Sequence, residues 1–166
     1  VEHPWYEKGY IQQEAGNVPD WIVNWLKEIF LKKAEIFNSN DKVFIDRRDD
    51  TKFNHCQIIN DEEVFQYLKS KGFSKYKVGE LPFKNQIHLF HNAKIIIGPH
   101  GAAFANLAFC KPQTKVIEFK PFNHPTVVNK RISEINDLNY KLIEAPDFKN
   151  EKGDILIDLN TLKKII

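Results

Sequence analysis

"KIIIGPHGAAFANLAFC", residues 94–110, joins an apolar run to a series of small residues through a turn of glycine, proline and histidine. The three consecutive isoleucines are β-branched and show no polar alternation, which predicts a strand covered on both faces. The residues after the turn place alanine, leucine and phenylalanine at helical spacing around Asn106 and predict a helix. A strand that opens directly into a helix is the basic unit of an α/β fold.

The remainder of the chain repeats this alternation of strand and helix patterns from Lys42 onward. Single helices between successive strands predict a parallel sheet of about five strands with helices on both faces, the doubly wound α/β class. A length of 166 residues suits one domain, which can bury roughly two thirds of its unfolded surface without metal or disulfides. We expect strands at 42–45, 76–79, 94–98, 115–119 and 140–145, and helices at 61–71, 84–92, 126–137, from 102 and from 158.

Two strand orders fit about five parallel strands, 2-1-3-4-5 and 3-2-1-4-5. Such sheets bind ligands beyond the carboxyl ends of the strands, where the strand order reverses. We favour 2-1-3-4-5, because it makes neighbours of the strand before "DRR" and the strand before "GPHG". Asp46, Arg47, Arg48 and His100 would then face one crevice.

Residues 1–41 are expected to form an N-terminal extension and an amphipathic helix that packs on the sheet, ahead of a Rossmann-like domain at 42–166. The apolar side of residues 20–37 recurs at helical spacing, and Asp20 after Pro19 is the expected N-cap. Aromatic residues are frequent in this segment and either form an exposed docking surface or pack inward. They include Trp5, Tyr6, Tyr10, Trp21 and Trp25.

The charge balance argues against a general nucleic-acid or membrane surface, since 24 basic and 22 acidic residues give a net charge of +2. No apolar stretch approaches the roughly 20 residues of a membrane span, and the N-terminus does not read as a signal peptide. Cys56 and Cys110 lack metal-ligand spacing, so reduced thiols and a cytoplasmic location are expected. The chain has no methionine and opens on Val1, so we expect either a removed initiator or a piece of a longer protein.

The turn at residues 98–101 is a candidate anion site. The helix after it would place unpaired N–H groups and the positive end of its dipole at the carboxyl edge of the sheet. Gly101 would let a phosphate approach the backbone, and His100 adds a titratable donor. Arg47 and Arg48 would supply bidentate donors from the opposite side. The alternative is that the glycines only form the turn and that "DRRDD" is a solvated charge cluster.

An ordered series of segments over about residues 42–145 resembles the carboxyl-terminal half of the family 61 glycosyltransferases, which include plant xylosyltransferases and bacterial capsular-polysaccharide proteins. The segments are "KVFIDRR", "IINDEEVFQYLKSKGF", "GELPFKNQIHLFHNAKIIIGPHGAAFANLAF" and "KVIEFKP". The resemblance implies a GT-B transferase whose carboxyl-terminal Rossmann-like domain holds the nucleotide-sugar donor. The positions that match the family's motifs for the donor are Arg47, His100, Gly101, Ala102, Asn106 and Glu118, and Gln86 matches as well.

The chain departs from the family's pattern in one loop. The family often has two basic residues four and three positions before the asparagine of "IIN", where this chain has Cys56 and Gln57. Lys52 or His55 could replace their charge. We therefore leave Cys56 and Gln57 out of the expected site.

Glycosyl transfer from a nucleoside diphosphate, here expected to be a UDP-sugar, builds negative charge on the departing phosphate. Preorganised donors aimed at that charge lower the barrier, so the two arginines, the histidine and the helix amides could act without a metal. No DxD-type pair stands at a strand end, and Asp49 and Asp50 lie in the loop after "DRR". Glu118 either binds ribose hydroxyls or is a sheet-edge residue paired with a lysine.

The family is understood to invert the transferred sugar, and the resemblance places the base and the acceptor-binding groups on the other half of a two-domain enzyme. The chain is therefore expected to be a donor-binding half, excised or partnered in trans, of an enzyme that acts on a glycan or polysaccharide. A receiver-type domain shares the sheet order but needs an aspartate where this chain reads "GPHG". A non-catalytic flavodoxin-like binding or interaction module stays open as the alternative.

Overall fold

The computed structural model describes residues 16–48, 56–122, 124, 126–146 and 153–166 of the chain. It contains a five-stranded sheet in the order β2-β1-β3-β4-β5, with every neighbouring pair parallel, so the favoured strand order and the doubly wound α/β class are confirmed. The strands are β1 (Lys42–Ile45), β2 (Ser74–Tyr76), β3 (Ile95–Pro99), β4 (Lys115–Pro121) and β5 (Asn139–Ala145).

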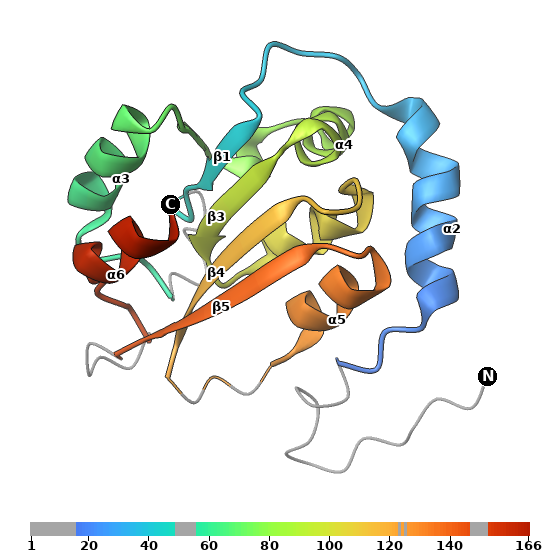
Figure 1. The fold of residues 1–166 in the computed structure, drawn as a ribbon. Helices are drawn as coiled ribbons and strands as arrows, with labels where there is room; N and C mark the ends of the chain where they lie inside the picture. The colour runs from blue at the N-terminus through green and yellow to red at the C-terminus, as the bar shows by residue number, and fades with distance from the viewer. Residues whose placement is uncertain (1–15, 49–55, 123, 125, 147–152) are drawn as a thin grey trace.

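Helices cover both faces of the sheet (Figure 1). One face carries α3 (Asp61–Ser70) and α6 (Leu159–Ile165), and the other carries α4 (Phe83–Asn92), the 3-10 helix η3 (Ala102–Phe109) and α5 (Val128–Ile135). The helix α2 (Asp20–Phe30), continued by η1 (Leu31–Lys33), packs mainly on η3 and α5 and so forms an outer layer on that side. The domain boundary expected after residue 41 stays a prediction.

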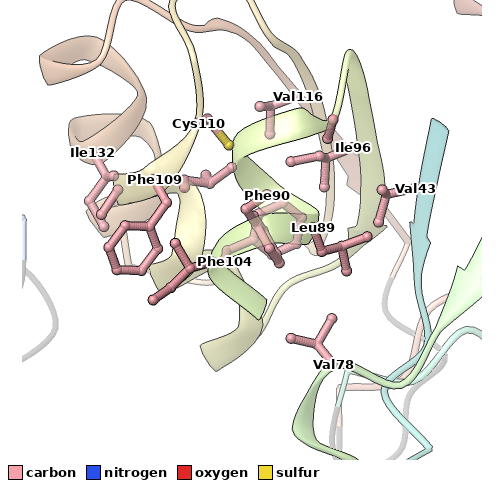
Figure 2. Packing of buried hydrophobic residues seen from close by; sticks show 14 of the residues in the cluster. Val43, Val78, Leu89, Phe90, Ile96, Phe104, Phe109, Cys110, Val116 and Ile132 are labelled. Atoms are coloured by element: carbon pink, nitrogen blue, oxygen red, sulfur yellow. The ribbon is translucent and has the colours of Figure 1, made fainter. Parts of the chain in front are cut away.

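Two hydrophobic clusters explain why the run of isoleucines at residues 95–97 has no polar alternation. Ile96 lies in the cluster beneath α4, η3 and α5, whereas Ile97 lies in the cluster beneath α3 and α6, because successive side chains of a strand point to opposite faces. Figure 2 shows Phe90 and Phe104 packed with Leu89 and Ile96 in the first cluster. A strand buried on both faces has no polar side to alternate with, as expected from its sequence.

Several local expectations need correction. The segment predicted as a strand at 76–79 is instead the end of β2 followed by the 3-10 turn η2 (Val78–Glu80), and the predicted helix at 126–137 is the shorter α5. Pro19, not Asp20, occupies the N-cap of α2, because the extended backbone at Pro19 makes Asp20 the first helical residue. The carboxylate of Asp20 accepts a hydrogen bond from Arg131 of α5.

The register of the central strands determines which residues meet at the candidate site. β1 pairs with β3 so that Phe44 faces Ile97, and the residues after Ile45 and Pro99 therefore emerge side by side at the carboxyl edge. A Cβ on Gly98 would lie 2.7 Å from the Cβ of Ile45, so glycine lets these two strands pack closely at that edge. Within the part of the chain that the structure describes, no helix combines the length and apolar character of a membrane span.

Candidate functional site

A cleft of about 310 Å³ opens where β1 ends, between η2, α4 and the start of η3. Four stretches that are distant in sequence meet there, as the reversal of strand order between β1 and β3 requires. Of the residues expected at the site, the lining includes Asp46, Arg47, Gln86, Gly101, Ala102 and Asn106. The lining residues are Ile45, Asp46, Arg47, Val78, Gly79, Gln86, Gly101, Ala102, Ala103 and Asn106.

Arg47 lies across the glycine turn at the rim of this cleft. Its guanidinium donates from Nη1 to the main-chain carbonyl of His100. A Cβ on Gly101 would lie 2.7 Å from Cζ of Arg47, well inside the distance at which two carbons can pack. A side chain at position 101 would therefore have to displace the flexible guanidinium of Arg47, whereas the extended backbone of Gly101 (φ 168°) could be adopted by any residue.

The start of η3 brings main-chain donors to the same rim. Among the described residues, the N–H groups of Gly101, Ala102 and Ala103 donate to no other group. The first N–H groups of a helix have no partner within the helix and favour anions. The sequence predicted an α-helix after the turn, but η3 is a 3-10 helix. Its first hydrogen bond runs from Phe104 N–H to Gly101 C=O.

Two amide side chains form the floor of the cleft. Asn106 is 8% exposed and donates from Nδ2 to Gln86 Oε1 at 3.1 Å and to Ala103 C=O at 3.2 Å. Gln86 in turn donates from Nε2 to Leu81 C=O at 2.9 Å, so the pair ties η3 and α4 to the segment before α4. Within the described residues, Oδ1 of Asn106 accepts no hydrogen bond and is the acceptor that the floor can offer to a ligand.

Arg48 is not among the residues that line this cleft, and it shares with Arg47 and Asp46 only a small neighbouring pocket. It donates from Nε to Asp46 Oδ1 at 2.9 Å and from Nη2 to Asp46 Oδ2 at 2.6 Å, and Nη1 lies 3.4 Å from Asp61. Burial raises the pKa of Asp46, but hydrogen bonds from Arg48 outweigh it and the pKa lies below its ordinary value. Arg48 thus neutralises a buried carboxylate on the α3 side of the sheet.

The side chain of His100 also lies outside the cleft lining. Its Nδ1 lies 2.5 Å from Glu118 Oε1, and its ring centroid is 4.3 Å from that of His124. Glu118 lies on β4 between β3 and β5, so it is not at the edge of the sheet, and its partners are His100, Asn129 and Tyr140 rather than a lysine. At 1% exposure, its carboxylate lies within the domain and away from the cleft where ribose binding was expected.

Asn129 and Tyr140 were missed in the sequence. The one available signal is Glu118 itself, a charged residue in the apolar run "KVIEF", which calls for buried donors. Nothing in the spacing says that those donors come from α5 and β5.

Other expected residues are distributed as follows. Asp49, Asp50, Lys52, His55, Trp5, Tyr6 and Tyr10 lie outside the described residues. Trp21 and Trp25 are 59% and 49% exposed on α2, so each keeps about half of its side chain in solvent. Cys56 and Cys110 are buried and are not joined in a disulfide, and burial raises the pKa of Cys110. Within the described ranges, no three histidine, cysteine, aspartate or glutamate side chains are grouped to hold a metal ion, and metal independence stays a prediction.

The comparison with known families agrees with this geometry. The family model described as Glycosyltransferase 61 matches residues 6–117, which are more than half of the chain. The chain belongs to glycosyltransferase family 61. The match covers β1, α4, β3 and η3, and with them every segment that lines the Arg47 cleft, whereas Glu118, Asn129 and Tyr140 lie beyond its end.

A curated relative of this family 61 chain is a beta-1,2-xylosyltransferase from Oryza sativa subsp. japonica. The two sequences are 26% identical over 117 residues. That segment is 65% of this chain and 22% of the rice protein, so the family 61 chain spans about a fifth of the length of this relative.

Proposed function

We propose that the Arg47 cleft binds the nucleoside-diphosphate part of a sugar donor. In this proposal the family 61 chain is the donor-binding half of a GT-B transferase, which moves the sugar to a glycan or polysaccharide acceptor with inversion. The other half, in the same polypeptide or in trans, supplies the base and the acceptor site. A cytoplasmic location and a role in capsular-polysaccharide synthesis belong to the same proposal.

The observation that carries this proposal is the meeting of Arg47 with the main-chain donors of η3. The guanidinium and the N–H groups of Gly101, Ala102 and Ala103 share one rim of the cleft. A planar, permanently charged guanidinium and helix-terminal amides are the donors that proteins use for phosphate oxygens. The β1–β3 switch point is also where open parallel sheets bind nucleotides.

The same donors suit the chemistry of glycosyl transfer. Negative charge grows on the diphosphate as the bond to the sugar breaks, and donors that are already fixed stabilise it without reorganisation. Arg47 is held by the carbonyl of His100 and the amides are held by η3, so both are positioned before a ligand arrives. We expect the donor to be a UDP-sugar and the departing charge to be stabilised without a metal ion.

A non-catalytic binding or interaction module is the second candidate. The half-exposed side chains of Trp21 and Trp25 on the outer layer favour it, since large aromatic side chains in solvent are frequent at protein contacts. This candidate predicts no nucleotide binding at the Arg47 cleft.

Calorimetric titration of the chain with UDP, GDP and TDP separates the two candidates. We expect weak binding of at least one diphosphate, several-fold weaker at high than at low salt because solvent-accessible ion pairs are screened. Uridine, which lacks the phosphates, is the matched control ligand and should bind far more weakly. An absence of heat and of thermal stabilisation at millimolar UDP, GDP and TDP would contradict the donor site and leave the binding module.

A further inference from the structure

The carboxylate of Asp46 closes a turn around Arg47. Its Oδ1 accepts a hydrogen bond from the main-chain N–H of Arg48 at 3.0 Å. A bond from an aspartate oxygen to the N–H two residues later forms an Asx turn, which restricts the residue in between. The peptide before Arg47 is fixed as well, because Asp46 N–H donates to Tyr76 C=O of β2 at 2.9 Å. The main chain is therefore held on both sides of Arg47.

Asp46 lies between the two environments into which the arginines diverge. It is 4% exposed and lines both the Arg47 cleft and the small pocket beside α3. Ahead of the turn, Arg47 reaches across the glycine segment to the carbonyl of His100. Behind it, Arg48 folds back on the carboxylate of Asp46. One side chain thus closes the turn about which the two guanidinium groups separate.

The ion pair with Arg48 does not explain the bond to the main chain. Nε and Nη2 of Arg48 already bind both oxygens of Asp46, at 2.9 Å and 2.6 Å, and so pair the charges. The main-chain N–H adds no charge to this pair, but it determines the direction in which the chain leaves β1. This bond needs an acceptor oxygen and not a negative charge. The two roles of Asp46 can therefore be separated by substitution.

We propose that Asp46 is a positioning residue for Arg47. Its Asx turn holds the main chain so that the guanidinium of Arg47 already lies at the rim of the cleft, beside the first N–H groups of η3, when a diphosphate arrives. A long arginine side chain loses conformational freedom when it is fixed on a ligand, and a donor that is positioned beforehand binds more tightly because less of that freedom is lost on binding. This inference rests on the proposed function.

Three variants separate the turn from the charge. Asp46→Ala removes both the acceptor and the charge, whereas Asp46→Asn removes the charge and keeps an oxygen for the N–H of residue 48. Asp158→Ala is the matched control, because Oδ1 of Asp158 accepts from the main-chain N–H of Asn160 at 3.0 Å in the same kind of turn. That turn begins α6, on the face of the sheet opposite α4 and η3 (Figure 1), and Asp158 is not in the lining of the Arg47 cleft.

The test combines UDP binding with a measurement on the ligand-free chain. Calorimetry gives the UDP affinity of each variant. The ¹⁵N signals of the arginine guanidinium groups are recorded without ligand, and those of Arg47 are assigned by their loss in Arg47→Ala. A guanidinium that is held by a carbonyl rotates slowly about its Cζ–Nη bonds and exchanges its protons slowly with water, so its signals report directly whether Arg47 stays on His100.

We expect Asp46→Ala to weaken UDP binding about tenfold and to make the Arg47 guanidinium rotate and exchange rapidly, since the donor is no longer preorganised. Asp46→Asn should restore the affinity to within about threefold of the unaltered chain and keep the slow Arg47 signals, because the turn is retained. Asp158→Ala should lower the stability and change neither measurement. If Asp46→Ala does not fold, the double variant Asp46→Ala/Arg48→Ala, which leaves neither charge without its partner, carries the comparison.

Two results would overturn the proposal. One is an Asp46→Ala chain whose UDP affinity and Arg47 signals match those of Asp158→Ala. The other is an Asp46→Asn chain that binds UDP as weakly as Asp46→Ala, which would assign the effect to the charge and not to the turn. A chain that binds no UDP would instead refute the proposed function. The ligand-free Arg47 signals would then still decide whether Asp46 positions the arginine.

Discussion

Arg47 and Arg48 are adjacent in the chain, yet they belong to regions of opposite character. Arg47 lies on the cleft side of the sheet edge and donates to a main-chain carbonyl beside the first N–H groups of η3, which have no acceptor among the described residues. Arg48 turns to the α3 side, where the carboxylates of Asp46 and Asp61 surround it. A charge held by carboxylates stabilises the fold, whereas a charge beside unpaired donors is placed to bind an anion.

The largest effect on this comparison should come from Gly101→Val. The new side chain would occupy the place of the Arg47 guanidinium and displace both the arginine and the approach to the amides. We expect UDP affinity to fall by more than about a hundredfold, measured by calorimetry, because several donors are lost together. Ala105→Val is the control, since the exposed Ala105 lies in η3 but not in the cleft lining, and UDP binding to it at normal strength is expected.

Removal of one arginine should have the next largest effect. Arg47→Ala removes a charged donor from the rim and should weaken UDP binding about ten- to a hundredfold, or about 1.4–2.8 kcal/mol. The melting temperature should change less than the affinity, because the Arg47 side chain lies at the lining of the cleft and not in either hydrophobic cluster. Unchanged UDP affinity in calorimetric titration would place the phosphate site elsewhere.

The neighbouring variant should show the reverse pattern. The carboxylate of Asp46 is 4% exposed. In Arg48→Ala it keeps one hydrogen bond from the described residues, which comes from the main-chain N–H of residue 48. A buried charge that loses its partner is destabilising, and with half of the Arg48 side chain in solvent we expect a loss of about 1–2 kcal/mol in urea unfolding. UDP affinity should stay within about twofold. Equal losses of affinity in Arg47→Ala and Arg48→Ala would remove the distinction between the two regions.

Acidification should lower the free energy of unfolding through Asp46, the partner of Arg48, and this is the smallest effect that we expect. The pKa of Asp46 lies below its ordinary value, so its pairing contributes stability above about pH 4 that is lost as the pH falls through the lowered pKa. Glu118 contributes in the same direction. Urea unfolding between pH 7 and pH 3 should therefore show a loss of stability that is smaller in Asp46→Asn. An acid dependence that is identical in the variant would show that Asp46 is not held in its charged form by the fold.

Much of the fold and part of the site could be predicted from local pattern. β-branched residues without polar alternation indicated the central strands, and single crossover helices indicated a parallel sheet, which the structure confirms. Arg47 and Gly101 were predicted because they follow strands at the carboxyl edge of the sheet, whereas Asn106 was predicted from the resemblance to family 61. The 3-10 form of η3 was not visible, since the same small residues fit either kind of helix.

The sequence by itself determined the class of fold and the segments that reach the carboxyl edge, because these depend on periodicity and on the order of elements along the chain. It favoured one of two strand orders, and the family followed from the resemblance of an ordered series of motifs. The tertiary structure alone decided which way each charged side chain turns. Arg48 and Glu118 have their partners on α3, α5 and β5, at distances that no local spacing records. The free energy of a buried charge depends on donors gathered from distant segments, so only the packed chain assigns Arg47 to the cleft and Glu118 to His100.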